Sequence, residues 1–197
     1  MRTRLVASVL TCGSVIILVG CGTGTSAAPE LDRPSPTEAA SPIPTVKNPR
    51  DVTAMARRPC ELLTSQQAVG FGLDHPPKQL DGLFGTLRCK WASTTRDRRT
   101  FRTVDVDMFT DNPTLEVAYN QDRGLPFFEL TEINGYPAIV SRTNADLPIC
   151  DIDVKPAERQ SVSVTYESQD FKNNPQQSCE VGKQVAAAVL MNLPLKG

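Results

Sequence analysis

The sequence predicts a small α+β domain: an antiparallel β-sheet with helices packed on one face, held together by two disulfides. Segments in which apolar and polar residues alternate follow one another through short turns, which favours antiparallel pairing. Apolar residues at helical spacing occur between and after these segments, and helices of that kind bury a sheet. Four cysteines are spread over the same region, and an even number in an exported chain indicates a disulfide framework.

Composition narrows the classes of protein that fit. The chain has 197 residues, of which 40% are apolar and 22% charged, as in an ordinary globular protein of one domain with appendages. Its 21 basic and 22 acidic side chains give none of the positive excess that nucleic-acid binding requires. We therefore expect no nucleic-acid partner.

The first residues have the features of a signal peptide. Arg2 and Arg4 precede an apolar stretch from Leu5 to Val19, and polar Gly- and Thr-rich sequence follows directly. The stretch is shorter than the roughly 20 apolar residues of a membrane-spanning helix. A cleaved signal peptide over residues 1–20 is therefore preferred to a retained anchor helix.

A lipid-attachment motif ends this segment. Leu18-Val19-Gly20-Cys21 resembles the lipobox of bacterial lipoproteins. The resemblance implies cleavage between Gly20 and Cys21, diacylglycerol on the Cys21 thiol, and acylation of the new amino group, for example by palmitate. Two or three acyl chains make a durable anchor, so we expect the protein on the outer face of the plasma membrane. The alternative, an unmodified Cys21 in a linker, leaves the abrupt change of composition unexplained.

Residues 21–58 are predicted to form a lipidated tether. Beyond Cys21 they are rich in Gly, Ser, Thr, Ala and Pro and contain almost no large apolar side chain. Such a sequence buries too little surface to order itself. Val52, Met55 and Ala56 suggest at most a short helical lead-in. The folded domain is accordingly expected over residues 59–197.

The first half of the domain combines a helix and a hairpin. Thr64-Ser65-Gln66-Gln67 fits a capping box, so a short helix is predicted from Ser65 to Gly70. Composition then predicts a loop over residues 73–77. Two alternating segments, Thr86–Ser93 and Thr103–Thr110, predict a half-buried hairpin.

The second half contains two helices and four strands. Asn112-Pro113 and Asn174-Pro175 each have the residues of a helix start. The terminal helix carries apolar residues three and four apart. Between the helices, alternation predicts four strands: Phe127–Ile133, Pro137–Arg142, Ile149–Val154 and Ser161–Glu167.

The cysteines carry the firmest chemistry of the mature chain. Cys12 leaves with the signal peptide and Cys21 is lipidated, so the domain retains Cys60, Cys89, Cys150 and Cys179. Three pairings are possible. We expect Cys60 with Cys89 and Cys150 with Cys179, because each pair joins a helix start to a strand over an equal separation. Zinc is disfavoured because no two of these cysteines have the close spacing of structural zinc motifs, and we expect no metal and no cofactor.

Few side chains could carry catalysis. The single histidine, His75, could act as a base oriented by Asp74, but adjacent residues rarely point together and an exposed loop histidine is preferred. Asp151 and Asp153 alternate with apolar residues and therefore share one strand face. They form either a carboxylate pair or a solvated surface, and the second interpretation is preferred because catalytic pairs also need a cleft. We therefore assign no catalytic residue.

Two further features are candidates for binding. Trp91 lies two residues after Cys89 on the same strand face, where packing over the first disulfide is preferred to stacking on a ligand. Arginines cluster at the predicted hairpin tip: Arg96, Arg98, Arg99 and Arg102. They are a possible docking site for an acidic group of a partner or for a phospholipid head, and a solvated turn is the alternative.

An ordered set of motifs resembles an actinobacterial family of secreted lipoproteins whose domain has no assigned function. The set comprises the lipobox, the Pro-rich tether, Pro59-Cys60, Cys89-Lys90-Trp91, Gly135-Tyr136-Pro137-Ala138, Cys150-Asp151-Ile152-Asp153-Val154 and Cys179 at the start of a helix. The resemblance covers about residues 58–194 and implies an anchored envelope protein with two disulfides. It brings no catalytic residue. The four-cysteine layout is also similar to extracellular sensor domains of actinobacterial receptor kinases, which would imply ligand binding.

These features predict a membrane-anchored, extracytoplasmic lipoprotein whose domain binds a ligand or protein partner of the cell envelope. One alternative is an envelope hydrolase acting on wall or lipid material, which should lose activity when His75 or Asp151 becomes alanine. The other is a purely structural wall component, which should bind no small ligand saturably. A binding module should instead respond to changes in an apolar pocket or in the arginine cluster.

Overall fold

The computed structural model describes residues 42–95, 100–111 and 114–197. The predicted signal peptide, Gly20, Cys21 and the first part of the tether lie outside the described residues. Arg96, Arg98 and Arg99 of the predicted arginine cluster lie outside them as well.

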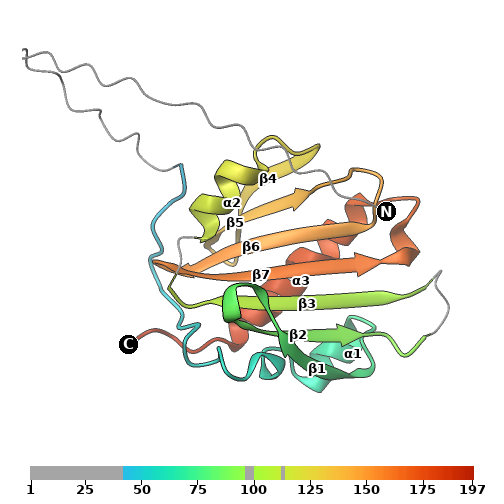
Figure 1. Ribbon diagram of the computed structural model, residues 1–197, viewed down its shortest axis with the longest axis horizontal. Helices are drawn as coiled ribbons and strands as arrows, with labels where there is room; N and C mark the ends of the chain where they lie inside the picture. The colour runs from blue at the N-terminus through green and yellow to red at the C-terminus, as the bar shows by residue number, and fades with distance from the viewer. Residues whose placement is uncertain (1–41, 96–99, 112–113) are drawn as a thin grey trace, which may run out of the picture. The chain divides into compact units, whose positions relative to one another are not determined.

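Seven antiparallel strands form one sheet in the order β1-β2-β3-β7-β6-β5-β4 (Figure 1). The strands are β1 (His75–Asp81), β2 (Leu87–Ala92), β3 (Arg102–Phe109), β4 (Phe127–Ile133), β5 (Tyr136–Arg142), β6 (Ile149–Ala157) and β7 (Gln160–Ser168). The helices are α1 (Ser65–Gly70), α2 (Thr114–Asp122) and α3 (Gln176–Asn192), with 3-10 turns η1 (Pro59–Glu61), η2 (Leu83–Gly85) and η3 (Gln169–Phe171). The predicted α+β class and the antiparallel sheet are confirmed.

One face of the sheet is apolar and holds the main core. Val106, Val164 and Ile152 lie side by side in the register of β3, β7 and β6, and all three are fully buried. Helix α3 covers this face and passes behind the sheet in Figure 1. Gly182 allows the close approach, because a Cβ at this position would lie 2.4 Å from the Ile152 side chain.

Both disulfides form as predicted. Cys60 is bonded to Cys89 and Cys150 to Cys179. The first joins the segment before α1 to β2, and the second joins β6 to the start of α3. Trp91 is 1% exposed in the core cluster that contains Cys89, which agrees with its predicted packing.

The other face of the sheet is polar and carries α2. Ser141 on β5 donates a hydrogen bond to Asp122 (2.9 Å), and Lys155 on β6 donates one to Glu116 (2.9 Å). A small apolar cluster around Leu115 and Ile139 completes the contact. The prediction of helices on one face therefore holds for α1 and α3, whereas α2 lies on the opposite face. The reason is that the apolar side of α2, with Leu115, Ala118 and Tyr119, predicts packing on the sheet but not which face the helix covers.

Strand β1 was not predicted, because its first residues were assigned to a loop. It pairs only with β2, at the edge of the sheet, and its register shifts between His75 and Lys78. Prolines are tolerated on such an edge because the outer N–H groups have no strand partner. Pro76 and Pro77 therefore interrupt the pattern without preventing the strand.

Residues 42–52, which we call the strap, belong to the packed domain and not to the tether. Ile43 and Val52 are buried, and the Val52 N–H donates to the Gln160 side chain (3.0 Å). Arg50 forms a bridge with Leu195 near the C-terminus. The predicted tether, 21–58, is therefore too long and the predicted domain, 59–197, starts too late. Isolated apolar residues in an extended segment give no periodic signal.

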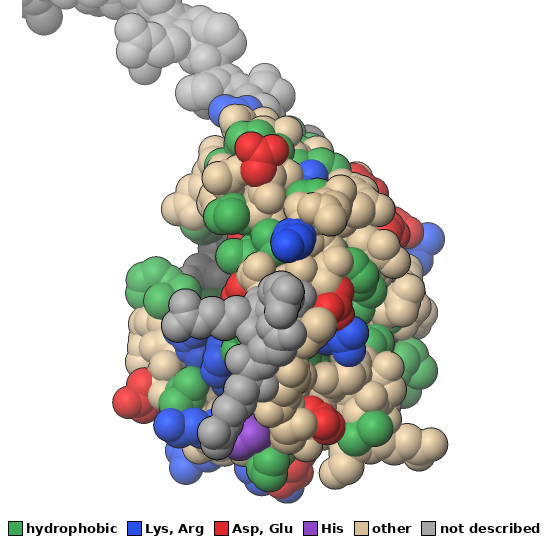
Figure 2. All heavy atoms as spheres, turned by 90° about the vertical axis from the view of Figure 1, so that its right-hand side faces the viewer, with side chains coloured by type: hydrophobic (Ala, Val, Ile, Leu, Met, Phe, Trp, Pro, Cys, Tyr) green, Lys and Arg blue, Asp and Glu red, His purple; other side chains and the backbone are tan. Residues whose placement is uncertain are grey.

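The strap runs along one end of the sheet, which we call the strap end. The Val46 N–H approaches the Glu158 carboxylate in the turn between β6 and β7 (3.5 Å), and the Tyr136 hydroxyl donates to the Asn48 carbonyl (2.8 Å). The opposite end, which we call the far end, holds the start of β1, the end of β2 and the β5–β6 connection. Figure 2 views the far end, where basic and acidic side chains are interspersed beside the histidine.

Candidate functional site

A groove of about 340 Å³ lies between α1 and the start of β1 at the far end. We call it the α1 groove. Trp91 and Leu73, both almost completely buried, form its inner wall, and Val69, 61% exposed, stands on its rim. The remaining lining residues are mostly apolar: Cys60, Leu63, Ser65, Ala68, Asp74, His75, Pro76 and Pro77.

The capping box that the sequence predicted positions one wall of this groove. The Thr64 hydroxyl accepts a hydrogen bond from the Gln67 N–H (3.2 Å), and the Gln67 side chain accepts one from the Thr64 N–H (2.9 Å). Asn192 at the end of α3 also donates to the Gln67 side chain (2.7 Å). Helix α1 is therefore fixed both by its own cap and by α3, as well as by the nearby Cys60–Cys89 bond.

Hydrogen bonds direct the Asp74 carboxylate to Thr94 and the His75 ring to the neighbouring Pro76 carbonyl. The Asp74 carboxylate accepts hydrogen bonds from the Thr94 N–H (2.6 Å) and hydroxyl (2.7 Å), and the Thr94 side chain is the main reason that the pKa of Asp74 is lowered. His75 places Nδ1 3.0 Å from the Pro76 carbonyl. His75 is exposed, as predicted, although it begins strand β1 and does not lie in a loop.

A second cavity, of about 390 Å³, lies on the other side of α1 and shares Val69 with the groove. Its walls include Phe71, Phe171 and Arg102. The Arg102 guanidinium is held by Asp170, to which Nε donates at 2.8 Å. Of the four predicted binding arginines, Arg102 thus lines a cavity but is occupied by an ion pair.

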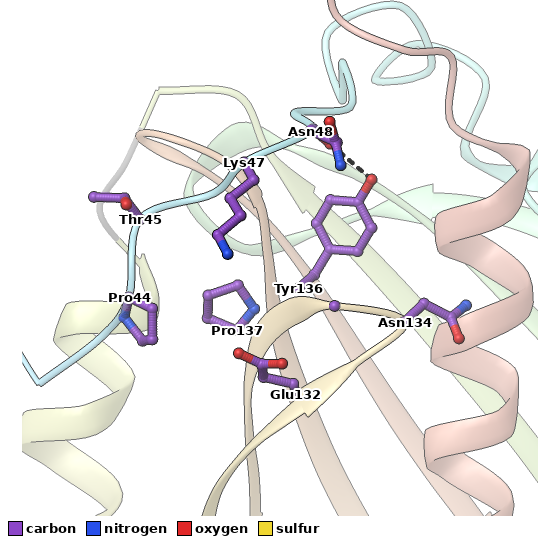
Figure 3. A pocket seen from close by; sticks show the side chains of 9 residues that line it. Pro44, Thr45, Lys47, Asn48, Glu132, Asn134, Tyr136 and Pro137 are labelled. Atoms are coloured by element: carbon purple, nitrogen blue, oxygen red, sulfur yellow. Dashed lines mark hydrogen bonds between the residues drawn. The ribbon is translucent and has the colours of Figure 1, made fainter.

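A third cavity, also of about 390 Å³, lies at the strap end between the strap and the β4–β5 turn (Figure 3). Lys47 points into it beside Pro137, with Glu132 below. The Tyr136 hydroxyl on its wall is occupied, because it accepts from Arg50 Nε (3.1 Å) and donates to Asn48. Lys47 and Glu132 place charges of both signs in this cavity, whereas Trp91 and Leu73 form an apolar wall in the α1 groove.

Asp151 and Asp153 share a face of β6, as predicted, and both residues are partly buried there. Thr165 donates to the Asp151 carboxylate (2.7 Å). Burial raises the pKa of Asp153 to about 7, against a lowering effect of the Ser163 hydrogen bond. Neither residue lines any of the three cavities described above.

The described residues contain no group of three His, Cys, Asp or Glu side chains that could hold a metal ion. All four cysteines of the domain are in disulfides. In the same part of the chain, no helix has the length and apolar character needed to cross a membrane.

Comparison with known proteins places the chain in a family. A family model described as a protein of unknown function, DUF3558, matches residues 16–192. The match covers most of the chain, so the chain belongs to this family, and the predicted domain of unknown function is confirmed in this respect. No curated protein and no solved structure matches significantly.

Sequence reasoning identified Trp91, His75 and Cys60 separately but missed that they line one groove. The groove was missed because strand β1 was not predicted. This strand pairs with β2 and brings His75 and Pro76 beside Trp91. An available signal was Val69, an apolar residue on a short helix whose buried side already had Ala68.

Proposed function

We propose that this protein is an exported lipoprotein, anchored through Cys21 on the outer face of the plasma membrane, that binds a small envelope ligand in the α1 groove. The observation that carries the proposal is the pairing of all four domain cysteines into two disulfides. Disulfides persist in oxidising compartments and are rare in the cytosol. The pairing leaves only Cys12 and Cys21 outside the domain, and Cys21 ends the lipobox-like motif.

The family match supports the anchor as part of the same protein type. The matched region begins at residue 16, inside the apolar stretch, and runs through Cys21 and the tether into the domain. In this chain, the matched region therefore includes both Cys21 and the folded domain. The resemblance to actinobacterial secreted lipoproteins rests on this same order of features.

The composition of the α1 groove favours binding of a small, largely apolar molecule. Ligand sites are usually concave, mostly apolar and supplied with a few polar groups that fix orientation, and their volumes start near about 300 Å³. Trp91 and Leu73 provide the apolar wall, while Ser65 and His75 provide polar groups at the edge. A ligand with an aliphatic or aromatic body and one hydrogen-bonding head fits this distribution.

No observation favours the hydrolase alternative. A histidine base needs a group that orients it, and the Asp74 carboxylate is bonded to Thr94. The carboxylate pair of β6 lies on the sheet face that α2 covers in part. These contacts favour binding over hydrolysis in the α1 groove, because His75 has no orienting hydrogen bond to Asp74.

Intact mass spectrometry of the protein extracted from its native membrane tests the anchor. The expected mass is that of residues 21–197 plus diacylglycerol, with or without an added acyl chain, and four thiols should become alkylated only after reduction. A mass that retains residues 1–20, or four thiols that react without reductant, would overturn the proposed location.

Binding in the groove is tested with the apolar fluorescent probe 1-anilinonaphthalene-8-sulfonate on the full mature protein. We expect saturable binding that Val69→Asp weakens at least tenfold, because the substitution places a carboxylate on the groove rim. Val117→Asp, at an exposed valine of α2, is the matched control and should change the affinity less than twofold. Equal losses in both variants, or no saturable binding, would contradict a ligand site in the groove.

A further inference from the structure

We propose that the strap end of the domain docks on the membrane, with Leu83 and Phe84 inserted into the lipid interface. The proposal rests on the lipid anchor proposed above and adds an orientation of the domain on its membrane. It commits the exposed apolar side chains at this end to a phospholipid surface.

The turn between β1 and β2 displays two large apolar side chains. Phe84 is 87% exposed and Leu83 is 55% exposed. Phe84 has a φ of +53°, a left-handed conformation that bulky residues rarely adopt. A conformation of this kind persists only when surrounding interactions enforce it, and it often marks a functional position.

Hydrogen bonds across the turn enforce this conformation. The Gly82 N–H donates to the Thr86 carbonyl (2.9 Å), and the Thr86 N–H donates to the Leu83 carbonyl (3.0 Å). The Thr86 hydroxyl donates to the same Leu83 carbonyl (2.7 Å). The turn is therefore a structured tip that holds the Phe84 ring outward at the edge of the sheet.

This tip lies at the same end of the sheet as the strap. The rings of Phe84 and Phe109 are 6.5 Å apart, and Phe109 pairs with Ser161 at the start of β7. The neighbouring Gln160 side chain accepts the hydrogen bond from Val52 in the strap. Figure 1 shows the turn and the strap on the left-hand side of the sheet.

Two more exposed apolar side chains occur where the chain ends beside the strap. Met191, in the last turn of α3, is exposed, and so is Leu195, which pairs with Arg50. Single exposed apolar residues are normal on a protein surface. Here, four exposed apolar side chains lie at the strap end, where the described chain also begins. Their accumulation at one end indicates a surface that another molecule covers.

The length of the tether identifies the lipid surface as the partner. Only 20 residues, 22–41, separate Cys21 from the first described residue, so the chain allows a separation of at most about 75 Å. A lipid on Cys21 would therefore keep the strap end within that reach of the bilayer. Because the anchor supplies a high local concentration, two inserted side chains can dock the domain although they would bind membranes poorly alone.

Depth-dependent quenching by brominated phospholipids tests the proposal on the full mature lipoprotein in phosphatidylglycerol–phosphatidylcholine vesicles. In Phe84→Trp, we expect the added tryptophan to lose at least half of its emission. Leu147→Trp is the control, because Leu147 is exposed in the β5–β6 connection at the far end, and its emission should not change. The native Trp91 is buried and gives a constant background.

Leu83→Trp provides a second probe of the tip, and thermal unfolding verifies that each variant folds. Equal quenching at residues 84 and 147, or none at residues 83 and 84, would overturn docking while the measured diacylglycerol mass leaves the proposed anchor intact. A mature protein without diacylglycerol would overturn the anchor and the docking together.

Discussion

At the scale of single residues, Asp153 shows how a neighbouring element changes the chemistry of a side chain. Asp151 and Asp153 lie on the polar face of β6, and Asp122 of α2 adds a third carboxyl group to their surroundings. Burial is the main cause that raises the pKa of Asp153 to about 7, and the nearby carboxylates add to it. The charged form is therefore unfavourable in the folded protein.

Asp153→Asn should change the pH dependence of stability. The pKa of Asp153 is raised from 3.8 to about 7, so its stabilising contribution is complete below pH 3.8 and is lost as the pH rises to about 7. We expect Asp153→Asn to be more stable than the wild type at pH 8, by roughly 2–4 kcal/mol, and to differ little at pH 4. Urea unfolding at both pH values measures this difference.

The control for this prediction is Asp146→Asn, at an exposed aspartate of the β5–β6 connection. It should be as stable as the wild type at both pH values. Other carboxyl groups with shifted pKa values contribute equally to both proteins, so the difference isolates residue 153. An Asp153→Asn variant that followed the wild-type stability at every pH would show that the carboxyl group is well solvated.

Sequence alone predicted the positions of such residues better than their environments. Alternation placed Asp151 and Asp153 opposite Cys150 and Ile152, because it follows from strand geometry. It gave no information on what covers that face, since the covering helix α2 is distant in sequence. The disulfide pairing was predictable because, of the three possible arrangements, one joins a helix start to a strand over an equal separation in each pair.

At the scale of elements, periodicity predicted β2 to β7, α1 and α3 with only small errors at their ends. It failed for β1 and for the strap. Both segments lie at the margin of the sheet, where their apolar residues are few and their prolines are tolerated. Their structure is set by partners far away in sequence, such as Leu195 for Arg50 and Ala92 for His75. The α1 groove was hidden for this reason.

The strap should contribute measurably to stability through Arg50. Its guanidinium donates to the Leu193 carbonyl and to the Tyr136 hydroxyl, so Arg50→Ala leaves both groups with fewer partners. Hydrogen bonds from charged groups contribute about 1.5–3 kcal/mol each, less where solvent competes. We expect Arg50→Ala to lower the free energy of unfolding by about 1–3 kcal/mol in urea titrations.

Arg57→Ala is the matched control, because Arg57 is an exposed arginine a few residues further along the chain. Its unfolding free energy should stay within about 0.5 kcal/mol of the wild type, as is usual for surface substitutions. If both variants were equally stable, the strap would be attached too weakly to carry the lipid tether to a defined end of the domain.

At the scale of the whole molecule, the two ends of the sheet have different contents. The strap end holds the start of the described chain, the Leu83–Phe84 tip and the exposed residues near the C-terminus. The far end holds the α1 groove and Arg102. A domain docked through its strap end would therefore present the groove away from the membrane, where envelope molecules can reach it.

The two disulfides have different positions in this arrangement. Cys150–Cys179 joins β6 to α3 in the centre of the core, and both cysteines are fully buried. Cys60–Cys89 joins the segment before α1 to β2, and Cys60 lines the groove. The loops that they close are equal, with a sequence separation of 29 in each case. The chain-entropy model therefore assigns each the same stabilisation, roughly 3.5 kcal/mol.

Removing the first disulfide should loosen the groove selectively. We expect Cys60→Ala/Cys89→Ala and Cys150→Ala/Cys179→Ala each to lose about 2–5 kcal/mol of stability. Only the first double variant should speed hydrogen exchange of the α1 amides at least tenfold beyond the change in global unfolding, because only this bond ties α1 to the sheet directly. Mass spectrometry of exchanged peptides covering residues 60–73 measures the effect. Equal acceleration in both variants would mean that α3, through Asn192 and Gln67, positions the groove and that the Cys60–Cys89 bond adds only global stability.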